Sequence, residues 1–315
     1  MRALVFEGNL HLRSDYPDPA PMPGESIVEV RLAGICGTDL EITRGYMEFR
    51  GVPGHEFVGR VVQSELASLK GKRVAGEINA SCGGCTWCID GMRRHCPTRT
   101  VLGILGRDGA FAEYLRLPNA NLWPLPDAIT DEAAVFIEPL AAAHEIFEQT
   151  HLNRTDRIAV LGDGRLGAMV ALALHWQSFL PIVGGHHREK LERLAALGLQ
   201  TAAEQELAPG FDVVIDCTGR SSGFSRALAL VRPRGTVILK STAAAGAAMN
   251  LAPVVINEIT LIGSRCGNFT PAIDALATGK FDPLLLIDGT YSLNDGVAAL
   301  AAAADKSKFK IVIRP

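Results

Sequence analysis

The part of the chain that follows Arg157 alternates short apolar runs with longer segments of helical periodicity. RIAVLG (157–162) is the first apolar run, and others lie at 180–185, 211–219, 236–242 and 259–266. Strands that alternate with helices of this length form a parallel sheet covered on both faces. The pattern therefore predicts an α/β fold for this half of the chain.

A glycine-rich turn joins the first of these strands to the first helix. Its residues are Gly162, Asp163, Gly164, Arg165, Leu166 and Gly167. In this setting the first glycine permits the tight turn, the second lets a pyrophosphate approach the backbone, and the third lets helix and strand pack closely. The helix N-terminus then faces the phosphates. We expect a dinucleotide here, although a plain strand-to-helix turn shares the local pattern.

The second strand ends without the acidic residue that usually binds the adenosine ribose hydroxyls. Gly184 and Gly185 are followed by His186, His187 and Arg188, and the first carboxylate comes later. A missing acid with basic neighbours suits a 2′-phosphate, which predicts NADP(H) in preference to NAD(H). The alternative is that these basic residues only form a solvated helix start.

Four of the seven cysteines crowd into fifteen residues. They are Cys82, Cys85, Cys88 and Cys96. Four thiolates at this spacing can close a tetrahedral zinc shell, and a closed shell leaves no open coordination position. The cluster therefore predicts a structural zinc ion. An iron–sulfur cluster also accepts four cysteines, and four unrelated thiols are the remaining alternative.

The first 120 or so residues show short strands broken by glycine and proline. Several isolated residues of metal-binding type lie there and in the helical segment that follows. Cys36, His55, Glu56 and Glu138 are such residues. Taken singly, each has a structural explanation: a buried thiol, a satisfied histidine or a helix start. Their spacing alone does not define a site.

Together, the motifs closely resemble the medium-chain dehydrogenase/reductase family, in its zinc-containing alcohol and polyol dehydrogenase branch. They occur in order as GICGTDLEI, PGHEFVG, the four-cysteine segment, DGAFAEYLRLP, IEPLA, GDGRLG, DCTG and KIVIRP. The resemblance implies a Rossmann doubly wound parallel sheet plus a GroES-like β-rich catalytic domain. The catalytic domain would span 1–149 with the zinc lobe at 82–96, the Rossmann domain 150–266, and 267–315 would return to the catalytic domain.

The resemblance also implies residue functions. Cys36, His55 and Glu138 match the ligands of a catalytic zinc, and Glu56 matches an acid that can exchange with water as a ligand. Asp39 matches the carboxylate that orients the zinc-binding histidine. Thr38 matches the hydroxyl that takes the substrate proton, and Glu41 stands where a relay histidine is common. Thr218 and Gly219 lie where the nicotinamide half of the cofactor rests.

The implied function is zinc-dependent hydride transfer between a secondary alcohol or polyol, or the matching ketone, and NAD(P), with two zinc ions per chain. The alternatives are a zinc-independent quinone or enone reductase of the same fold and a non-catalytic nucleotide-binding protein. The formal net charge of −3 gives no nucleic-acid or membrane footprint. No apolar run approaches membrane-spanning length. We expect a cytoplasmic homodimer or homotetramer that acts on a small molecule. The identity of this substrate stays open, because the loops that shape the substrate pocket are shortened between Glu41 and His55 and between Gln63 and Arg73.

Overall fold

The computed structural model describes residues 1–242, 249–279 and 283–315, and it divides into two compact units. Unit 1 comprises Met1–Glu138 and Leu276–Pro315, and unit 2 comprises Pro139–Ala275. The predicted boundaries lay at 149/150 and 266/267. The structural boundaries fall inside two helices, Ile137–Gln149 and Phe269–Ala277, and assign most of each to the unit with the parallel sheet.

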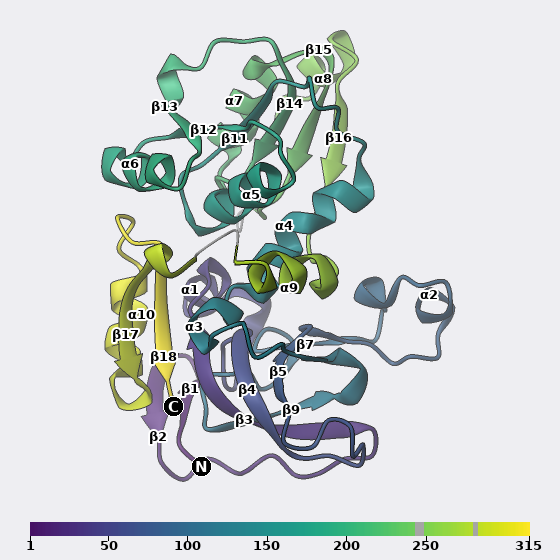
Figure 1. Cartoon of the computed structure of the whole chain (residues 1–315), viewed down its shortest axis with the longest axis vertical. Helices are drawn as coiled ribbons and strands as arrows, with labels where there is room; N and C mark the ends of the chain where they lie inside the picture. Colours follow the sequence, from purple (N-terminus) through teal and green to yellow (C-terminus); the bar gives the residue numbers. More distant parts are fainter. Residues whose placement is uncertain (243–248, 280–282) are drawn as a thin grey trace. The chain divides into compact units, whose positions relative to one another are not determined.

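Unit 2 has the alternating pattern predicted from the sequence (Figure 1). Its strands are β11 (Ile158–Leu161), β12 (Ile182–Gly185), β13 (Gln200–Ala203), β14 (Phe211–Asp216), β15 (Val231–Leu239) and β16 (Thr260–Gly263). Its helices are α5 (Arg165–Trp176), α6 (Arg188–Ala196), η4 (Glu204–Glu206), α7 (Ser221–Leu230) and α8 (Ala252–Ile256), with most of α4 (Ile137–Gln149) and α9 (Phe269–Ala277).

The six strands of unit 2 form one parallel sheet in the order β13-β12-β11-β14-β15-β16. The order reverses direction between β11 and β14, which defines a doubly wound fold. Right-handed crossovers then place α5 and α6 on one face and α7 and α8 on the other. Ligands of such sheets bind outside the carboxyl ends of the strands at the point of reversal. The predicted α/β class and Rossmann architecture are confirmed.

One strand of this sheet was not predicted from the sequence. Strand β13 is short, carries the residues QTAA and is only partly buried at the sheet edge. It lacks the apolar run that marks β11 or β14, because an edge strand covered on one side needs fewer apolar side chains.

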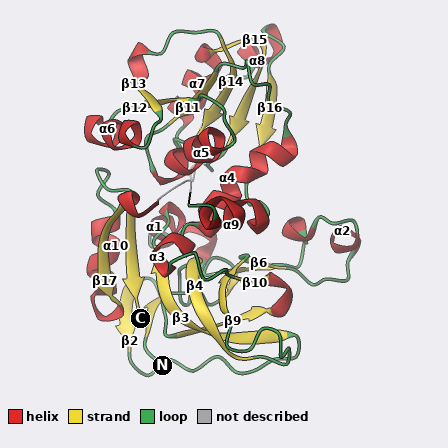
Figure 2. Ribbon diagram, in the orientation of Figure 1, coloured by secondary structure: helices red, strands yellow, loops and turns green. Residues whose placement is uncertain are grey.

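Unit 1 is rich in short strands, as predicted (Figure 2). Its strands are β1 (Ala3–Phe6), β2 (Leu10–Arg13), β3 (Glu25–Gly34), β4 (Glu56–Gln63), β5 (Arg73–Gly76), β6 (Asn79–Ala80), β7 (Thr100–Leu102), β8 (Gly106–Arg107), β9 (Tyr114–Pro118), β10 (Leu122–Pro124), β17 (Ile287–Ser292) and β18 (Lys310–Arg314). Its helices are α1 (Gly37–Ile42), η1 (Tyr46–Glu48), α2 (Thr86–Ile89), η2 (Arg93–His95), η3 (Asn119–Asn121), α3 (Asp131–Ala134), η5 (Pro283–Leu286), η6 (Leu293–Asp295) and α10 (Gly296–Ala303).

The main sheet of unit 1 joins the two ends of the sequence. Its order is β10-β5-β4-β3-β18-β17, and β9 also pairs with β3. Strand β18 is buried over Lys310–Ile313 and pairs antiparallel with β3, where Val312 faces Gly34. The last segment of the chain therefore returns to the β-rich unit.

Among the residues that the structure describes, no helix is both long enough and apolar enough to cross a membrane.

Candidate functional site

The four cysteines of the 82–96 segment converge in the structure. Cys85 is the N-cap of α2, and Gly83 and Gly91 adopt the left-handed backbone that the two tight turns need. The Sγ–Sγ distances are 3.9 Å for Cys82–Cys88, 3.5 Å for Cys85–Cys88, 3.8 Å for Cys85–Cys96 and 3.6 Å for Cys96–Cys82. Tetrahedral zinc with bonds of about 2.3 Å requires sulfur–sulfur distances of about 3.8 Å. The donor set therefore fits one zinc ion.

Backbone and hydroxyl groups around the lobe favour the thiolate form at two of its four sulfurs. The backbone N–H of Cys82, together with the Thr98 hydroxyl, lowers the pKa of Cys96 to about 6. Backbone N–H groups of Gly84 and Cys85 also lower the pKa of Cys82. Since the thiolate is the form that binds metals, these contacts favour metal binding at Cys82 and Cys96. At Cys85 the Cys88 N–H lowers the pKa, but burial and the neighbouring sulfurs outweigh it and raise this pKa to about 11.

A second group of metal-binding side chains lies in unit 1. The ligand atoms of Cys36, His55 and Glu56 lie within 4.8 Å of one another, and the two latter residues are buried. Cys36 is the N-cap of α1, and Glu56 begins β4 opposite Gly34 of β3. A Cβ at Gly34 would lie 2.6 Å from Oε2 of Glu56, so the glycine makes room for this carboxylate.

Asp39 connects the members of this group from beneath. It is fully buried, and its Oδ2 accepts a hydrogen bond of 2.8 Å from the backbone N–H of Cys36. Its Oδ1 accepts one of 3.1 Å from Gly54 N–H and lies 3.3 Å from Nδ1 of His55. Burial lowers the pKa of His55, but Asp39 and the Cys36 side chain outweigh it and hold this pKa well above the ordinary value. Cys36, His55 and Glu56 supply sulfur, nitrogen and oxygen donors of the kind that zinc binds, and Asp39 is a buried carboxyl beside them.

Glu138 does not belong to that group. It lies in the first turn of α4 and is half-buried, at the last position of unit 1. Its assignment as the third ligand stays a prediction from resemblance. The Oγ1 of Thr38, by contrast, lies 3.8 Å from Sγ of Cys36. Glu41 pairs with Arg44 at 2.6 Å on the surface of α1.

The shortened loop after α1 has an unusual backbone. Met47 and Glu48 both have positive φ, at 60° and 51°. Residues other than glycine rarely adopt a positive φ, and those that do are often found at functional sites. This loop lies in the segment expected to shape the substrate pocket.

Sequence reasoning did not single out Lys310, which begins β18. Its Nζ forms a buried ion pair with Oε2 of Glu56 and lies 5.6 Å from the centroid of the Phe136 ring. The exposed fractions of Lys310 and Glu56 are only 2 % and 1 %. The motif KIVIRP was visible, but a lysine at a strand start is usually exposed, so its partner could not be inferred.

We expect Lys310→Met to destabilise the protein by about 3–5 kcal/mol, because it leaves the Glu56 carboxylate buried without a counter-ion. Urea unfolding would measure the change, and the double variant Lys310→Met/Glu56→Gln should recover most of it. Arg314 on the same strand pairs with Glu132 at 3.0 Å, but this pair is exposed. The control Arg314→Met should therefore cost less than about 1 kcal/mol. Equal losses in the two single variants would contradict the assignment.

The glycine-rich turn of unit 2 has the geometry of a phosphate cradle. Gly162 has a φ of 105°, and a Cβ at Gly167 would lie 1.8 Å from the carbonyl oxygen of Gly162. A Cβ at Gly164, the N-cap of α5, would meet nothing within 4 Å. The space beside Gly164 and the first-turn amides of α5, including those of Arg165 and Leu166, fit a pyrophosphate.

The end of β14 lies beside this turn. A Cβ at Gly162 would lie 3.2 Å from the carbonyl oxygen of Cys217. Asp216 accepts hydrogen bonds from the N–H and hydroxyl of Thr218, at 2.9 and 2.7 Å. Gly219 donates its N–H to Oγ of Ser241 at 2.7 Å. The carboxyl ends of β11 and β14 therefore meet at the reversal point of the sheet, where a dinucleotide would bind.

Each basic residue after β12 is paired with an acid. His186 lies 3.2 Å from Glu204, His187 lies 2.9 Å from Asp163, and Arg188 lies 2.7 Å from Glu192. Linear spacing could not reveal two of these pairs, because Asp163 and Glu204 come from the turn after β11 and from η4. Each residue of the 186–188 run therefore has an acidic neighbour in the folded protein.

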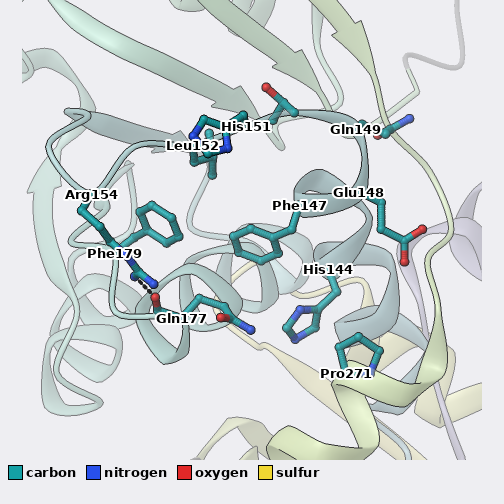
Figure 3. Close-up of a pocket in the computed structure, with 11 residues that line it drawn as sticks. His144, Phe147, Glu148, Gln149, His151, Leu152, Arg154, Gln177, Phe179 and Pro271 are labelled. Carbon is teal, nitrogen blue, oxygen red and sulfur yellow. Dashed lines mark hydrogen bonds between the residues drawn. The ribbon is translucent and has the colours of Figure 1, made fainter.

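A separate pocket of about 530 Å³ lies wholly within unit 2 (Figure 3). None of the site residues predicted from the sequence lines it. His144 of α4 lies at its wall, is 3 % exposed, and its Nε2 has no hydrogen-bond partner in the described structure. Its ring packs against Phe147 and Trp176. Burial lowers the pKa of His144 to about 4.

This histidine predicts a pH-dependent stability. The folded state holds His144 neutral until pH about 4, whereas the unfolded chain protonates it near pH 6.5. The contribution of the neutral His144 to the free energy of unfolding is therefore fully present above pH 6.5 and is lost as the pH falls towards 4. Between pH 7.5 and 5, the wild type should lose about 2 kcal/mol more than His144→Leu in urea unfolding. The exposed His151 of the same pocket supplies the control His151→Leu, and parallel pH profiles for wild type and His144→Leu would refute the prediction.

Comparison with known proteins places these features in one family. The model for the alcohol dehydrogenase GroES-like domain matches residues 22–127, and the model for zinc-binding dehydrogenase matches residues 166–278. The L-threonine 3-dehydrogenase of Streptomyces coelicolor is 31 % identical over 99 % of both chains. The solved structure of the alcohol dehydrogenase rspB from E. coli CFT073 with NADH is 27 % identical, with a TM-score of 0.90, and covers 100 % of this chain and 99 % of its own. A zinc-binding dehydrogenase from Sinorhizobium meliloti bound to NADP is 26 % identical at the same TM-score and coverage.

Proposed function

The chain belongs to the zinc-containing alcohol and polyol dehydrogenase branch of the medium-chain dehydrogenase/reductase family, and on this basis we propose how its residues carry out hydride transfer. The reaction interconverts a secondary alcohol or polyol and the matching ketone, with NAD(P) as hydride acceptor or donor. The observation that carries the proposal is the group formed by Cys36, His55 and Glu56 over the fully buried Asp39.

We propose two zinc ions per chain. The four-cysteine lobe would hold a structural ion, because its sulfur–sulfur distances match a closed tetrahedral shell. Cys36, His55 and Glu138 would hold the catalytic ion, with Glu56 able to take the place of a water ligand. A zinc ion at this second position would supply Lewis-acid polarisation of the substrate oxygen, and nicotinamide would supply the hydride chemistry.

The chain's own side chains orient these groups and handle the proton. Oδ1 of Asp39 lies 3.3 Å from Nδ1 of His55, and this contact would orient the ring so that its other nitrogen binds the metal. Thr38 would relay the proton of the substrate hydroxyl: its Oγ1, which lies 3.8 Å from Sγ of Cys36, would accept this proton and give its own to water or to Glu41. Glu41 is engaged by Arg44, so it would pass the proton on only when this surface pair opens.

The cofactor is a nicotinamide dinucleotide held by Gly162, Gly164 and Gly167, with Thr218 and Gly219 towards its nicotinamide half. At the adenosine end, two interpretations compete. The run His186, His187 and Arg188 favours NADP(H), because three basic residues suit a 2′-phosphate. The acids paired with them favour NAD(H), because acidic side chains beside the adenosine end would repel a 2′-phosphate.

The edge of the unit 2 sheet is the proposed meeting point of two copies. Strand β16 ends the strand order and is largely exposed. Val255 and Ile256 of the preceding α8 are 78 % and 77 % exposed. An exposed strand edge with apolar neighbours favours pairing with another chain. We propose a homodimer or homotetramer with this edge in its interface, located in the cytoplasm.

The test is a panel of secondary alcohols, polyols, ketones, enones and quinones, run with NAD(H) and NADP(H), with the zinc content measured on the same preparation. Reduction of a cofactor by a secondary alcohol or polyol, with two zinc ions per chain, supports the proposal. Turnover of enones or quinones alone, with one zinc ion or none, supports the zinc-independent reductase. Cofactor binding without turnover of any compound supports a nucleotide-binding protein.

A further inference from the structure

Asp163, the second residue of the glycine-rich turn, occupies an unusual position. Its side chain leaves the turn and reaches the end of the neighbouring strand β12. Its Oδ2 accepts backbone N–H groups of His186 at 2.8 Å and His187 at 2.6 Å. Nδ1 of His187 lies 2.9 Å from Oδ1. The residue is only 5 % exposed, so this arrangement is built into the fold.

The carboxylate of Asp163 fills the space that an acidic residue at the end of β12 would otherwise use. That position is Gly185, and a Cβ built on it would lie 2.4 Å from Oδ2 and 2.7 Å from Cγ of Asp163. In dinucleotide-binding folds, the acid at the end of the second strand binds the ribose hydroxyls of adenosine. The turn after β11 therefore delivers a carboxylate to the place where β12 supplies none.

Neighbouring charges point to the same ligand. Burial raises the pKa of Asp163, but the two backbone amides and the His187 ring outweigh it and hold this pKa below the ordinary value, so the group is a carboxylate at neutral pH. Glu204, at the start of η4, adds a second carboxylate beside His186, with a side chain 15 % exposed. A ribose diol can donate hydrogen bonds to a carboxylate, whereas a 2′-phosphate beside these acids would be repelled.

We infer that Asp163 is the residue that recognises the adenosine ribose hydroxyls, and that it makes the protein select NAD(H) over NADP(H). This inference rests on the proposed function, and it reverses the preference predicted from the linear sequence. The aspartate remains bound to the two amides and to His187 through Oδ2, while Oδ1 has His187 as its one described partner. A carboxylate oxygen accepts more than one hydrogen bond, so Oδ1 retains capacity for a ribose hydroxyl.

Two half-cofactor probes test this without any turnover. 5′-AMP carries the free ribose hydroxyls, and adenosine 2′,5′-bisphosphate adds the 2′-phosphate. Titration calorimetry of the zinc-loaded protein should show that wild type binds 5′-AMP at least about 30-fold more tightly than the bisphosphate. Asp163→Asn keeps one oxygen for the backbone amides but loses the charge. This variant should bind 5′-AMP about tenfold more weakly than the wild type does. Its preference for 5′-AMP over the bisphosphate should be smaller by at least about tenfold.

Matched variants separate recognition from a purely structural contribution. Asp156 also accepts a backbone N–H, from Asn153 at 2.8 Å, in the turn before β11. Asp156→Asn should leave the preference unchanged. Arg188→Ala should change 5′-AMP binding less than about twofold, because its side chain is exposed and paired with Glu192.

Two outcomes would overturn the inference. One is a wild type that binds the bisphosphate more tightly, with Arg188→Ala removing that advantage, which would support an NADP(H) enzyme. The other is an Asp163→Asn variant that loses affinity for both probes equally, which would show that Asp163 only stabilises the turn. A protein that binds 5′-AMP as expected but oxidises no alcohol would contradict the proposed function and leave this inference intact.

Discussion

Replacing Cys36 with serine is expected to halve the zinc content, from two ions per chain to one, and to lower kcat/KM by about a thousandfold or more. A metal acting as a Lewis acid lowers the activation barrier by several kcal/mol, and each 1.36 kcal/mol of barrier changes the rate tenfold. Cys36 begins α1, and its backbone N–H would still be held by Asp39. Stability should therefore change much less than activity. Metal analysis, steady-state kinetics on the best substrate of the panel and urea unfolding measure the three quantities.

Cys266 supplies the control for this experiment, because it is a half-buried cysteine outside both metal-binding groups. Cys266→Ser should keep two zinc ions and near-normal kcat/KM. Glu138→Ala should match Cys36→Ser in both zinc loss and activity loss if Glu138 is the third ligand. A Glu138→Ala protein with two zinc ions and full activity would instead assign the third ligand to Glu56, which already lies within the group.

The variant Cys88→Ser is expected to lose the other zinc ion and to open the lobe. Cys88 is buried among the three other sulfurs. Structural zinc binding in small metal-dependent folds is worth about 10–16 kcal/mol at neutral pH, which far exceeds what a short segment with two-residue strands can supply by itself. Trypsin should then cleave rapidly after the half-buried Arg94 and Arg99. Limited proteolysis with mass spectrometry, beside metal analysis, measures both effects.

Chelation of the wild type should reproduce this local opening, and Cys266→Ser should resist trypsin as the wild type does. The variants Cys36→Ser and Cys88→Ser should therefore differ in which property they lose. The first loses activity with a closed lobe, and the second becomes protease-sensitive in the lobe. A Cys88→Ser protein that keeps two zinc ions and resists trypsin would show that the sulfurs do not hold a metal.

The predicted fold was confirmed because its signals are local. The strand β11, the glycine-rich turn and α5 adjoin in the sequence, so periodicity and glycine spacing were enough to recognise them. The edge strand β13 carries no apolar run and was missed. The domain boundaries stay a prediction, and the two compact units divide inside the continuous helices α4 and α9.

The candidate sites show a similar limit. The four cysteines could be grouped from their spacing, whereas Cys36 and His55 could be linked only through resemblance to a family. The partner of Glu56, Lys310, lies 254 positions further along the chain, so no spacing rule could connect them. The acids beside His186 and His187 come from other loops as well. The run that reads as basic along the sequence is therefore bordered by acids in the folded protein.

The pairing of β18 with β3 has a consequence for the order of assembly during synthesis. Unit 2 is one continuous segment, so it can close as soon as it has left the ribosome. Unit 1 must wait, because β3 has its neighbour β18, and Glu56 of β4 has its partner Lys310, only after about 250 further residues have been translated. At about 5–20 residues per second, this delay is on the order of 10–50 seconds. During that time Glu56 lacks its ammonium partner, so the metal-binding group matures last although its cysteine and histidine are made first.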